Sequence, residues 1–471
     1  MTQIQGHPHP AAKGRLRGRQ RYLFRFWQAL LAEEKLPQCD RWIARQMKQH
    51  RQFGKQDRYW YSELLFAGLR FGYLAAFLEF LAQLSSGDSL PGPDRLVRAM
   101  EAFQKRFPDW AALKQGWQAI PPEVFFFWVD SRYRRVVQQP GLSTGLDAVP
   151  AATRHRRALF SAVEQHLPEL AFPRGAMLWH GLPLWYTACV EERAVRSGWE
   201  TPRLQLFLER QSFRPPLWLR LNAPEQGEQV LAELAASGFV AEADGLALKV
   251  RGQRGIFELQ CYRKGWVEIQ DWASQQLGRL VWARPGQMVW DCCAGGGGKT
   301  LQIATDPQGL NRRGAVYASD IREYKLKELL QRARRAQLPN IRVLPWDGNT
   351  LPAFGKEVEK RRGFHWVLVD APCSATGTWR RNPDAKYRFH PSGLEEWVAL
   401  QARLLSRAAD AVRPGGRLVY ATCSWLVQEN EQVVQQFLAD HPQFHLLEMQ
   451  LFGNPDRDAD TTFGAVLEKR T

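Results

Sequence analysis

The feature that most constrains the fold is a strand, a glycine loop and a helix in direct succession. Residues 287–291, QMVWD, are β-branched or aromatic, four consecutive glycines follow at Gly295–Gly298, and Lys299-Thr300 open the amphipathic segment TLQIATDPQ. Glycines at such a junction let the backbone approach a ligand, and the free N–H groups of the helix start face it. The stretch predicts a site for a nucleotide-like cofactor, the alternative being a glycine loop without a ligand.

Strands and helices alternate from residue 275 onward, which predicts a doubly wound, Rossmann-like α/β sheet. The expected strands are 287–291, 314–320, 341–347, 365–374 and 416–424, and the expected helices are 300–308, 322–337, 392–412 and 431–441. A last strand, 462–469, is expected to close the edge of the sheet.

The chain before the sheet divides into three parts by pattern. Apolar spacing of three and four predicts an all-helical domain over residues 1–140, and Pro, Gly and small residues predict a linker at 141–153. Residues 154–265 are expected to form helices followed by a small α+β unit, and 266–471 the catalytic sheet. Leu64–Leu84 is the most apolar window, but charged residues interrupt it, so it predicts a buried helix and not a membrane span.

Charge and cysteine usage restrict the partners and the compartment. The net charge is +16, and residues 1–60 carry 13 Lys and Arg against 4 Asp and Glu. This basic arm is a candidate RNA contact, and a solvated basic helix surface is the equally weighted alternative. Seven Cys show neither a paired framework nor C-x-x-C metal spacing, which predicts free thiols, a reduced cytoplasm and no metal site. No apolar signal segment begins the chain, so secretion is not expected.

Four expected strands end in a carboxylate, at Asp291, Asp320, Asp347 and Asp370. Ligands of such sheets bind outside the carboxyl ends of the strands. Asp320 has the spacing from the glycine loop at which a carboxylate accepts hydrogen bonds from ribose hydroxyls, and Asp347 is expected beside an adenine. Each could instead be a helix N-cap, but the set together with the glycine loop favours a ligand site.

The segment GGGGKT also permits a P-loop, with HWVLVD as the strand that presents a magnesium-binding Asp. The P-loop pattern requires glycine at the position of Cys293. The shorter loop therefore favours an adenosyl ligand over a triphosphate.

Two cysteines follow neighbouring strands of the expected sheet. Cys373 lies in DAPCSATG and Cys423 in YATCS, so both thiols are expected in the cofactor cleft. Each could be an inert core residue, but Arg380, Arg381 and Lys386 are expected to supply positive charge that favours a thiolate. Thiolate attack on carbon 6 of a cytosine makes carbon 5 nucleophilic toward a methyl group, and a base must then remove the carbon 5 proton. Asp370 could hold the edge of the flipped base.

Three motifs carry a resemblance to a known family: DCCAGGGGKT at 291–300, DAPCSATG at 370–377 and YATCS at 420–424. The chain resembles the S-adenosylmethionine-dependent RNA cytosine-C5 methyltransferases, and among them the bacterial 16S ribosomal RNA enzymes of the RsmB/NOL1/NOP2/Sun type with a NusB-like N-terminal domain. Segments 214–222, 267–275 and 380–389 are similar to family segments, and 54–70 resembles the NusB-like helix pattern.

The resemblance implies roles for individual residues. Cys423 would be the nucleophile at carbon 6, Cys373 would assist product release, and Asp370 would orient the cytosine. The S-adenosylmethionine site would be lined by Cys293, Ala294, Gly295, Gly296, Gly297, Gly298, Lys299, Asp320, Asp347 and Asp370. The division of roles between the thiols rests on the resemblance and not on spacing.

The resulting expectation is a cytoplasmic, monomeric enzyme that acts on RNA, most of all ribosomal RNA, and not at a membrane. Two other hypotheses stay open: a P-loop ATPase that depends on Lys299, and a non-catalytic RNA-binding or assembly factor that keeps the fold. The presence of both thiols and all four strand-end carboxylates argues against the last.

Overall fold

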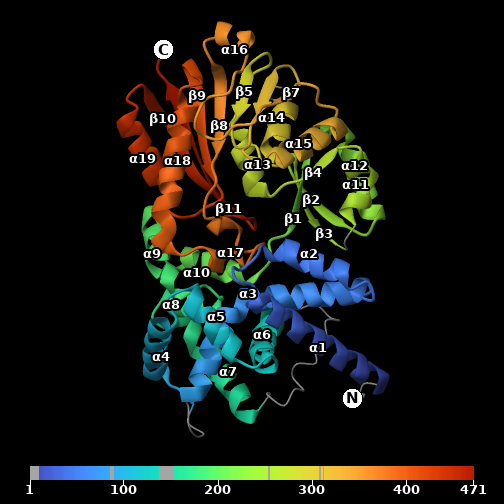
Figure 1. Ribbon diagram of the computed structural model, residues 1–471, viewed down its shortest axis with the longest axis vertical. Helices are drawn as coiled ribbons and strands as arrows, with labels where there is room; N and C mark the ends of the chain where they lie inside the picture. Colours follow the sequence, from blue (N-terminus) through green and yellow to red (C-terminus); the bar gives the residue numbers. More distant parts are fainter. Residues whose placement is uncertain (1–9, 85–89, 137–152, 253–254, 307–308, 311) are drawn as a thin grey trace. The chain divides into compact units, whose positions relative to one another are not determined.

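The computed structural model describes residues 10–84, 90–136, 153–252, 255–306, 309–310 and 312–471 (Figure 1). Contacts divide the chain into two units, one of residues up to Arg214 with Trp379–Pro391, the other of Pro215–Thr378 with Ser392–Thr471. The chain thus leaves the second unit after Thr378 and returns to it at Ser392.

This division differs from the expected domain boundaries. The expected connecting domain, 154–265, is split, because its helices group with the first unit and its strands with the second. The expected linker, 141–153, lies outside the described residues except for Thr153, whose hydroxyl accepts a hydrogen bond from the N–H of Arg156 at the start of a helix.

The first unit is built of helices. Their bounds are α1 (Pro10–Ala32), α2 (Cys39–Gln49), α3 (Lys55–Leu84), α4 (Pro93–Arg106), α5 (Trp110–Ala119), α6 (Pro122–Val136), α7 (Arg154–His166), α8 (Arg174–Trp179), α9 (Thr187–Arg196), α10 (Thr201–Glu209) and α17 (Ala385–Arg388). An N-terminal all-helical region was predicted, and it is confirmed.

The long helix α3 lies at the centre of this unit. It is long and apolar enough to cross a membrane by composition, but 89% of its most apolar window is buried inside the protein. Its charged residues have polar partners: Glu79 accepts hydrogen bonds from Trp128 and Arg156, and Arg70 donates to backbone carbonyl groups. The prediction of a buried helix is confirmed.

The second unit begins with a small antiparallel sheet in the order β2-β3-β1-β4. Its strands are β1 (Leu217–Leu221), β2 (Val240–Asp244), β3 (Ala247–Arg251) and β4 (Val267–Ile269), and the helices beside it are α11 (Gly227–Ala236) and α12 (Gln260–Arg263). Leu219, Val230, Leu234 and Leu248 are among the residues of its buried core. This is the predicted small α+β unit.

A seven-stranded sheet follows in the order β10-β11-β9-β8-β5-β6-β7. Its strands are β5 (Met288–Asp291), β6 (Ala315–Ala318), β7 (Ile341–Val343), β8 (Phe364–Asp370), β9 (Val412–Thr422), β10 (Phe444–Gly453) and β11 (Thr461–Lys469). Strands β5 to β9 are parallel, and β11 runs antiparallel between β9 and β10. The expectation that the last strand closes the edge is wrong, because β10 takes that position.

Helices cover both faces of this sheet, as predicted (Figure 1). One face packs against α13 (Trp272–Arg279), α14 (Gly298–Thr305) and α15 (Glu323–Arg335), and the other against α16 (Lys356–Lys360), α18 (Leu394–Ala409) and α19 (Glu431–Asp440). Successive strands run outward from β5 in one direction and from β8 in the other, so the strand order reverses between these two. Ligands of such sheets bind at the carboxyl ends of the strands beside this point.

Candidate active site

The glycine loop joins β5 to α14 at the point where the strand order reverses. Gly295 and Gly297 have positive φ angles of 54° and 85°. A side chain at Gly297 would clash with its neighbours, because a Cβ atom there would lie 2.5 Å from Cγ of Leu329 and 2.9 Å from Cδ1 of Leu301. The loop therefore needs glycine for its conformation and for its packing on α15.

Two arginines hold the carbonyl groups of this loop. Arg220, on β1 of the small sheet, is buried and donates to the carbonyl oxygen of Gly298 over 2.9 Å. Arg332, on α15, donates to the carbonyl of Gly296 and to the buried carboxylate of Glu268 on β4. The small sheet thus holds the glycine loop, directly through Arg220 and indirectly through Glu268 and Arg332. Sequence patterns did not predict this contact.

Asp291 ends β5 beneath the loop and is 1% exposed. The hydroxyl of Thr300 donates to its Oδ2 over 2.6 Å, whereas Oδ1 is buried without a hydrogen-bond partner among the described residues. Burial raises the pKa of Asp291 to about 7, with a smaller contribution from the charge of Asp370. A buried acceptor without a partner is a fitting feature for a site that receives a polar ligand.

Lys299, in the first turn of α14, forms an ion pair with Asp370 at the end of β8. Its Nζ lies 2.7 Å from Oδ2 of Asp370. Burial opposes the charged ammonium, but the negative charges of Asp370, Asp291 and Cys423 outweigh it and raise the pKa of Lys299. The Lys299 ammonium is therefore paired with the carboxylate at the end of β8 and lies close enough to Cys423 to interact with its charge.

Asp320 follows β6 and reaches back to the glycine loop. Its Oδ2 accepts a hydrogen bond of 2.9 Å from the N–H of Gly295, and both oxygens accept hydrogen bonds from Arg322. Burial opposes ionisation, but these hydrogen bonds and the Arg322 charge outweigh it and lower the pKa of Asp320. With the N–H of Arg322, which donates to Oδ1, the carboxylate accepts four hydrogen bonds and its acceptor sites are filled, so a ribose hydroxyl would have to replace one of these donors.

Asp347 differs from Asp291 and Asp320 because it is exposed. It follows β7 in an exposed loop and accepts hydrogen bonds from the backbone and side-chain amide groups of Asn349. These bonds lower its pKa. Asp347 follows the carboxyl end of β7, as predicted, but its hydrogen bonds are those of a local turn.

The two thiols meet, as their positions on neighbouring strands predicted. Parallel pairing aligns Asp370 of β8 with Ala421 of β9, and the Sγ atoms of Cys373 and Cys423 are 3.3 Å apart. The pKa of Cys373 is raised well above its ordinary value, first by its hydrogen bond with Cys423, then by burial and by the negative charge of Cys423 and Glu429. Cys373 is therefore a protonated thiol at neutral pH.

The expectation that Arg380 and Lys386 charge the thiols is not supported by their contacts. Lys386 is buried in the helical unit and donates to the carbonyl oxygens of Arg70 and Gly181, and Arg380 donates to that of Phe213. Neither is among the charges that shift the pKa of Cys373. The charge of Cys423 contributes instead to the raised pKa of Lys299, whose helix begins at the same edge of the sheet where β8 ends.

Two buried residues beyond Cys423 belong to the site and escaped the sequence analysis. Glu429 and Asn430 are fully buried in the turn between β9 and α19 and make hydrogen bonds to the loops of both thiols. A polar Gln-Glu-Asn run directly after the apolar segment WLV is the signal that could have found them.

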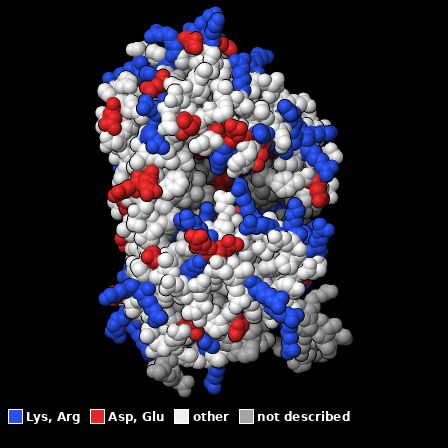
Figure 2. All heavy atoms as spheres, in the orientation of Figure 1, with Lys and Arg blue, Asp and Glu red and all other residues white. Residues whose placement is uncertain are grey.

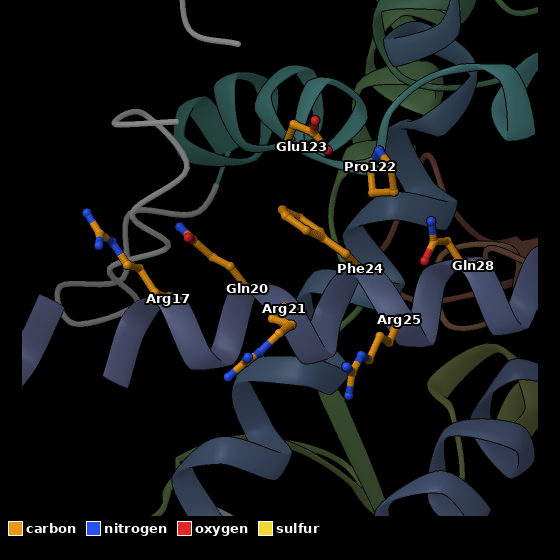
Figure 3. Close-up of a pocket in the computed structure, with 8 residues that line it drawn as sticks. All are labelled: Arg17, Gln20, Arg21, Phe24, Arg25, Gln28, Pro122 and Glu123. Carbon is orange, nitrogen blue, oxygen red and sulfur yellow. The ribbon is translucent and has the colours of Figure 1, made fainter. Parts of the chain in front are cut away.

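Among the residues that the structure describes, no group of three or more His, Cys, Asp or Glu side chains could hold a metal ion. A separate shallow groove lies on the helical unit, lined by Arg17, Gln20, Arg21, Phe24, Arg25, Gln28, Pro122 and Glu123. Figure 3 shows Phe24 pointing from α1 toward the start of α6. The three arginines are exposed, and Figure 2 shows Lys and Arg spread widely over the face it displays.

Comparison with known proteins places this site in context. Residues 280–465 match the family described as 16S rRNA methyltransferase RsmB/F. The chain is 32% identical over 259 residues to ribosomal RNA small subunit methyltransferase B of Erwinia tasmaniensis, covering 54% of this chain and 58% of that protein. It is 30% identical over 299 residues to the protein of that name from Yersinia pestis, covering 61% and 66%. The match thus spans between 58% and 66% of the length of these relatives.

Solved structures share the fold at lower identity. The crystal structure of PH0851 has a TM-score of 0.60 at 22% identity and covers 90% of this chain and 93% of its own. The structure of NSun6 from Pyrococcus horikoshii with SFG has a TM-score of 0.50 at 17% identity and covers 60% and 98%. At this identity the likeness concerns the fold alone.

Proposed function

We propose that the protein transfers a methyl group from S-adenosylmethionine to carbon 5 of a cytosine in RNA, because residues 280–465 match the family described as 16S rRNA methyltransferase RsmB/F. Ribosomal RNA of the small subunit is the proposed substrate, because the relatives carry that description. The proposed compartment is the cytoplasm, and the proposed assembly is a monomer.

The observation that carries the proposal is the pair of thiols 3.3 Å apart beside the Lys299–Asp370 ion pair. Methyl transfer to an oxygen or an exocyclic nitrogen needs no thiol, because these atoms have lone pairs. Carbon 5 of cytosine has none, so it needs a nucleophile that adds at carbon 6. Two thiols at one strand edge are the groups for such a covalent reaction.

The glycine loop and the strand ends fit the cofactor. Cys293 to Lys299 line the loop, Asp320 is proposed to accept the ribose hydroxyls, and Asp347 is proposed to lie near the adenine. The unpartnered Oδ1 of Asp291 adds a buried acceptor to this site. When bound, S-adenosylmethionine supplies an electrophilic methyl group.

The chain's own residues then divide the work. The Cys423 thiolate forms a bond with carbon 6, and the electrons of the 5,6 double bond make carbon 5 nucleophilic. After methylation, a general base takes the carbon 5 proton, and the electrons of that C–H bond restore the 5,6 double bond as the Cys423 thiolate leaves carbon 6. The Asp370 carboxylate, held by Lys299, is proposed to orient the cytosine through its amino edge.

The protonation of Cys373 supports the division of roles between the thiols. Its raised pKa keeps it a thiol that can donate a hydrogen bond to the sulfur of Cys423. A thiol with a raised pKa is a poor nucleophile, which favours Cys373 as the residue for product release, and the resemblance to the family makes Cys423 the proposed nucleophile.

The helical unit is proposed to contact RNA and to have a NusB-like role. The basic groove of Arg17, Arg21 and Arg25 matches the charge of a phosphate backbone, and Phe24 offers an aromatic ring beside it.

The test is transfer of labelled methyl from S-adenosylmethionine to total RNA of a deletion strain, with the labelled nucleoside identified. We expect 5-methylcytidine in small-subunit ribosomal RNA, no transfer by Cys423→Ser, and a covalent protein–RNA adduct that accumulates with Cys373→Ala. Full turnover by Cys423→Ser would contradict the mechanism. ATP hydrolysis that requires Lys299, without methyl transfer, would contradict the reaction.

A further inference from the structure

The loops that carry the two thiols are fastened by two neighbouring side chains that take no part in the proposed chemistry. Glu429 and Asn430 are 0% exposed. They lie in the turn between β9 and α19, in the same unit as both thiols. Each makes several hydrogen bonds, so neither is a buried polar group left over by folding.

Glu429 serves the loop of Cys373. The N–H of Ser374 donates to its Oε1 over 2.8 Å, and the Ser374 hydroxyl donates to its Oε2. Gln401, on α18, donates both to Oε1 of Glu429 and to the carbonyl oxygen of Pro372. The residues on both sides of Cys373 are therefore held by this carboxylate or by the amide bound to it.

Asn430 serves the loop of Cys423. The Thr422 hydroxyl donates to its Oδ1 over 2.6 Å, and its Nδ2 donates to the carbonyl oxygen of Ser424 over 2.9 Å. The residues on both sides of Cys423 are thus held by the one side chain. The arrangement at Cys373 is repeated here with a neutral amide in place of a carboxylate.

The two loops are also joined to each other. The hydroxyls of Thr376 and Ser424 are 2.9 Å apart, and the N–H of Gly377 donates to the carbonyl oxygen of Cys423 over 2.9 Å. A buried hydrogen-bond framework thus joins the loops of the two thiols, in addition to the contact between the sulfur atoms. Catalytic groups lose rate steeply when they are displaced by even about 1 Å.

We propose that Glu429 and Asn430 are positioning residues with separate duties, Asn430 placing Cys423 for addition to carbon 6 and Glu429 placing Cys373 for product release. The inference rests on the proposed function of the site. If the two adjacent buried residues were merely structural, their substitution should affect both steps of the reaction alike. As positioning residues, they should affect two different steps.

The test uses small changes on each side, in the full chain. Ser374→Ala removes one hydrogen bond to Glu429 and a long contact of 3.4 Å with the Ser424 hydroxyl. Thr422→Val removes one hydrogen bond to Asn430 and one from the N–H of Ser424 while keeping the side-chain shape. Each is introduced alone and together with Cys373→Ala, which is expected to trap the covalent adduct. Glu429→Gln and Asn430→Ala repeat the two tests at the positioning residues. Glu396→Gln, on exposed α18 surface, is the matched surface control.

The readouts are the rate of adduct formation, the amount of adduct at steady state, kcat, and the affinity for S-adenosylmethionine. In the Cys373→Ala background we expect Thr422→Val to slow adduct formation about 10-fold or more, and Ser374→Ala to leave it unchanged. With Cys373 intact, Ser374→Ala and Glu429→Gln should lower kcat and accumulate adduct, whereas Thr422→Val and Asn430→Ala should lower kcat without it. Cofactor affinity should be unchanged throughout.

Equal effects of the two sides on adduct formation, with adduct present in Cys373→Ala, would overturn the separate duties. A loss of cofactor affinity in step with kcat would likewise overturn them in favour of a structural role. Absence of any adduct in Cys373→Ala would instead overturn the proposed mechanism itself, and with it the assignment.

Discussion

The buried carboxylate of Asp291 couples the stability of the second unit to pH. Asp291 is 1% exposed, and burial raises its pKa to about 7, above the value near 4 of an exposed carboxyl group. The folded state therefore binds the proton more tightly than the unfolded state does. The stabilisation is complete below about pH 4 and is lost as the pH rises toward 7.

Asp291→Asn removes this titration while keeping the shape of the side chain. We expect the variant to gain stability over the wild type between pH 5 and pH 7, by on the order of a few kcal/mol at the upper end, and the difference to stay constant above pH 7. Urea unfolding of both proteins without cofactor, at pH values from 5 to 8, measures it. Asp410→Asn, on the surface, should show no such trend, and a pH-independent difference for Asp291→Asn would contradict the argument.

At the same scale, the sequence predicted residues that stand in motifs and missed those that act through hydrogen bonds. Cys373 and Cys423 follow neighbouring strands, so strand order alone brought them together. Arg220 touches the site only because a distant segment folds against it, and its spacing in the chain carries no trace of that contact. Glu429 follows Cys423 closely in the chain, but its bond to the loop of Cys373 depends on the pairing of β8 with β9. The charge assigned to Lys386 failed for the same reason, since backbone carbonyls of the helical unit surround it.

At the scale of the element, the glycine loop requires glycine at position 297 but not at the neighbouring position 296. Gly297 has a φ of 85°, and a Cβ atom there would lie 2.5 Å from Leu329. Gly296 lacks a positive φ, and its Cβ atom would meet only the ends of two long side chains, Arg332 at 3.3 Å and Glu328 at 3.9 Å. We expect Gly297→Ala to lose about 2 kcal/mol of stability and at least about 10-fold in cofactor affinity, because strain and overpacking add.

Gly296→Ala is the matched control and should stay within about 1 kcal/mol of the wild type. Thermal unfolding and calorimetric titration with S-adenosylmethionine measure the two effects. Equal losses in both variants would show that loop entropy, and not the packing of Gly297 on α15, determines the need for glycine.

The elements themselves were predictable wherever their period was clear. Strands β5, β6, β8 and β9 are buried along most of their length and read as short apolar runs, whereas β10 is half-exposed with the irregular pattern HLLEMQ. That strand was missed, and with it the edge of the sheet was assigned to β11. An amphipathic edge strand pairs because its neighbour offers a free edge, which is a property of the assembled sheet and not of the segment.

For the whole molecule, the path of the chain between its two units could not be read from the sequence. Residues 379–391 follow the Cys373 loop directly and resemble the segment of a catalytic domain, yet they pack in the helical unit. Tyr186 of that unit donates to the carbonyl groups of Lys386 and Phe389, and Asp384 accepts from the N–H of Cys39. Such long-range contacts leave no periodic signal, so the expected boundaries followed composition instead.

The net charge of +16 is a property of the whole chain, and it makes a prediction about RNA that does not depend on the chemistry of the thiols. If the groove of Arg17, Arg21 and Arg25 neutralises phosphates, binding releases counterions and weakens with salt. The change of all three to Gln should reduce the slope of log affinity against log salt by about 2 to 3, since each contact contributes about 0.7 to 0.9.

The triple change to Lys keeps the charge and should keep most of the slope, which separates charge from the bidentate geometry of arginine. Filter binding of a ribosomal RNA fragment between low and physiological salt measures both variants beside the wild type. A slope unchanged in the Gln variant, with affinity also unchanged, would mean that the basic excess of the first helix is a solvated surface, and that the RNA contacts must be sought on other basic faces of the chain.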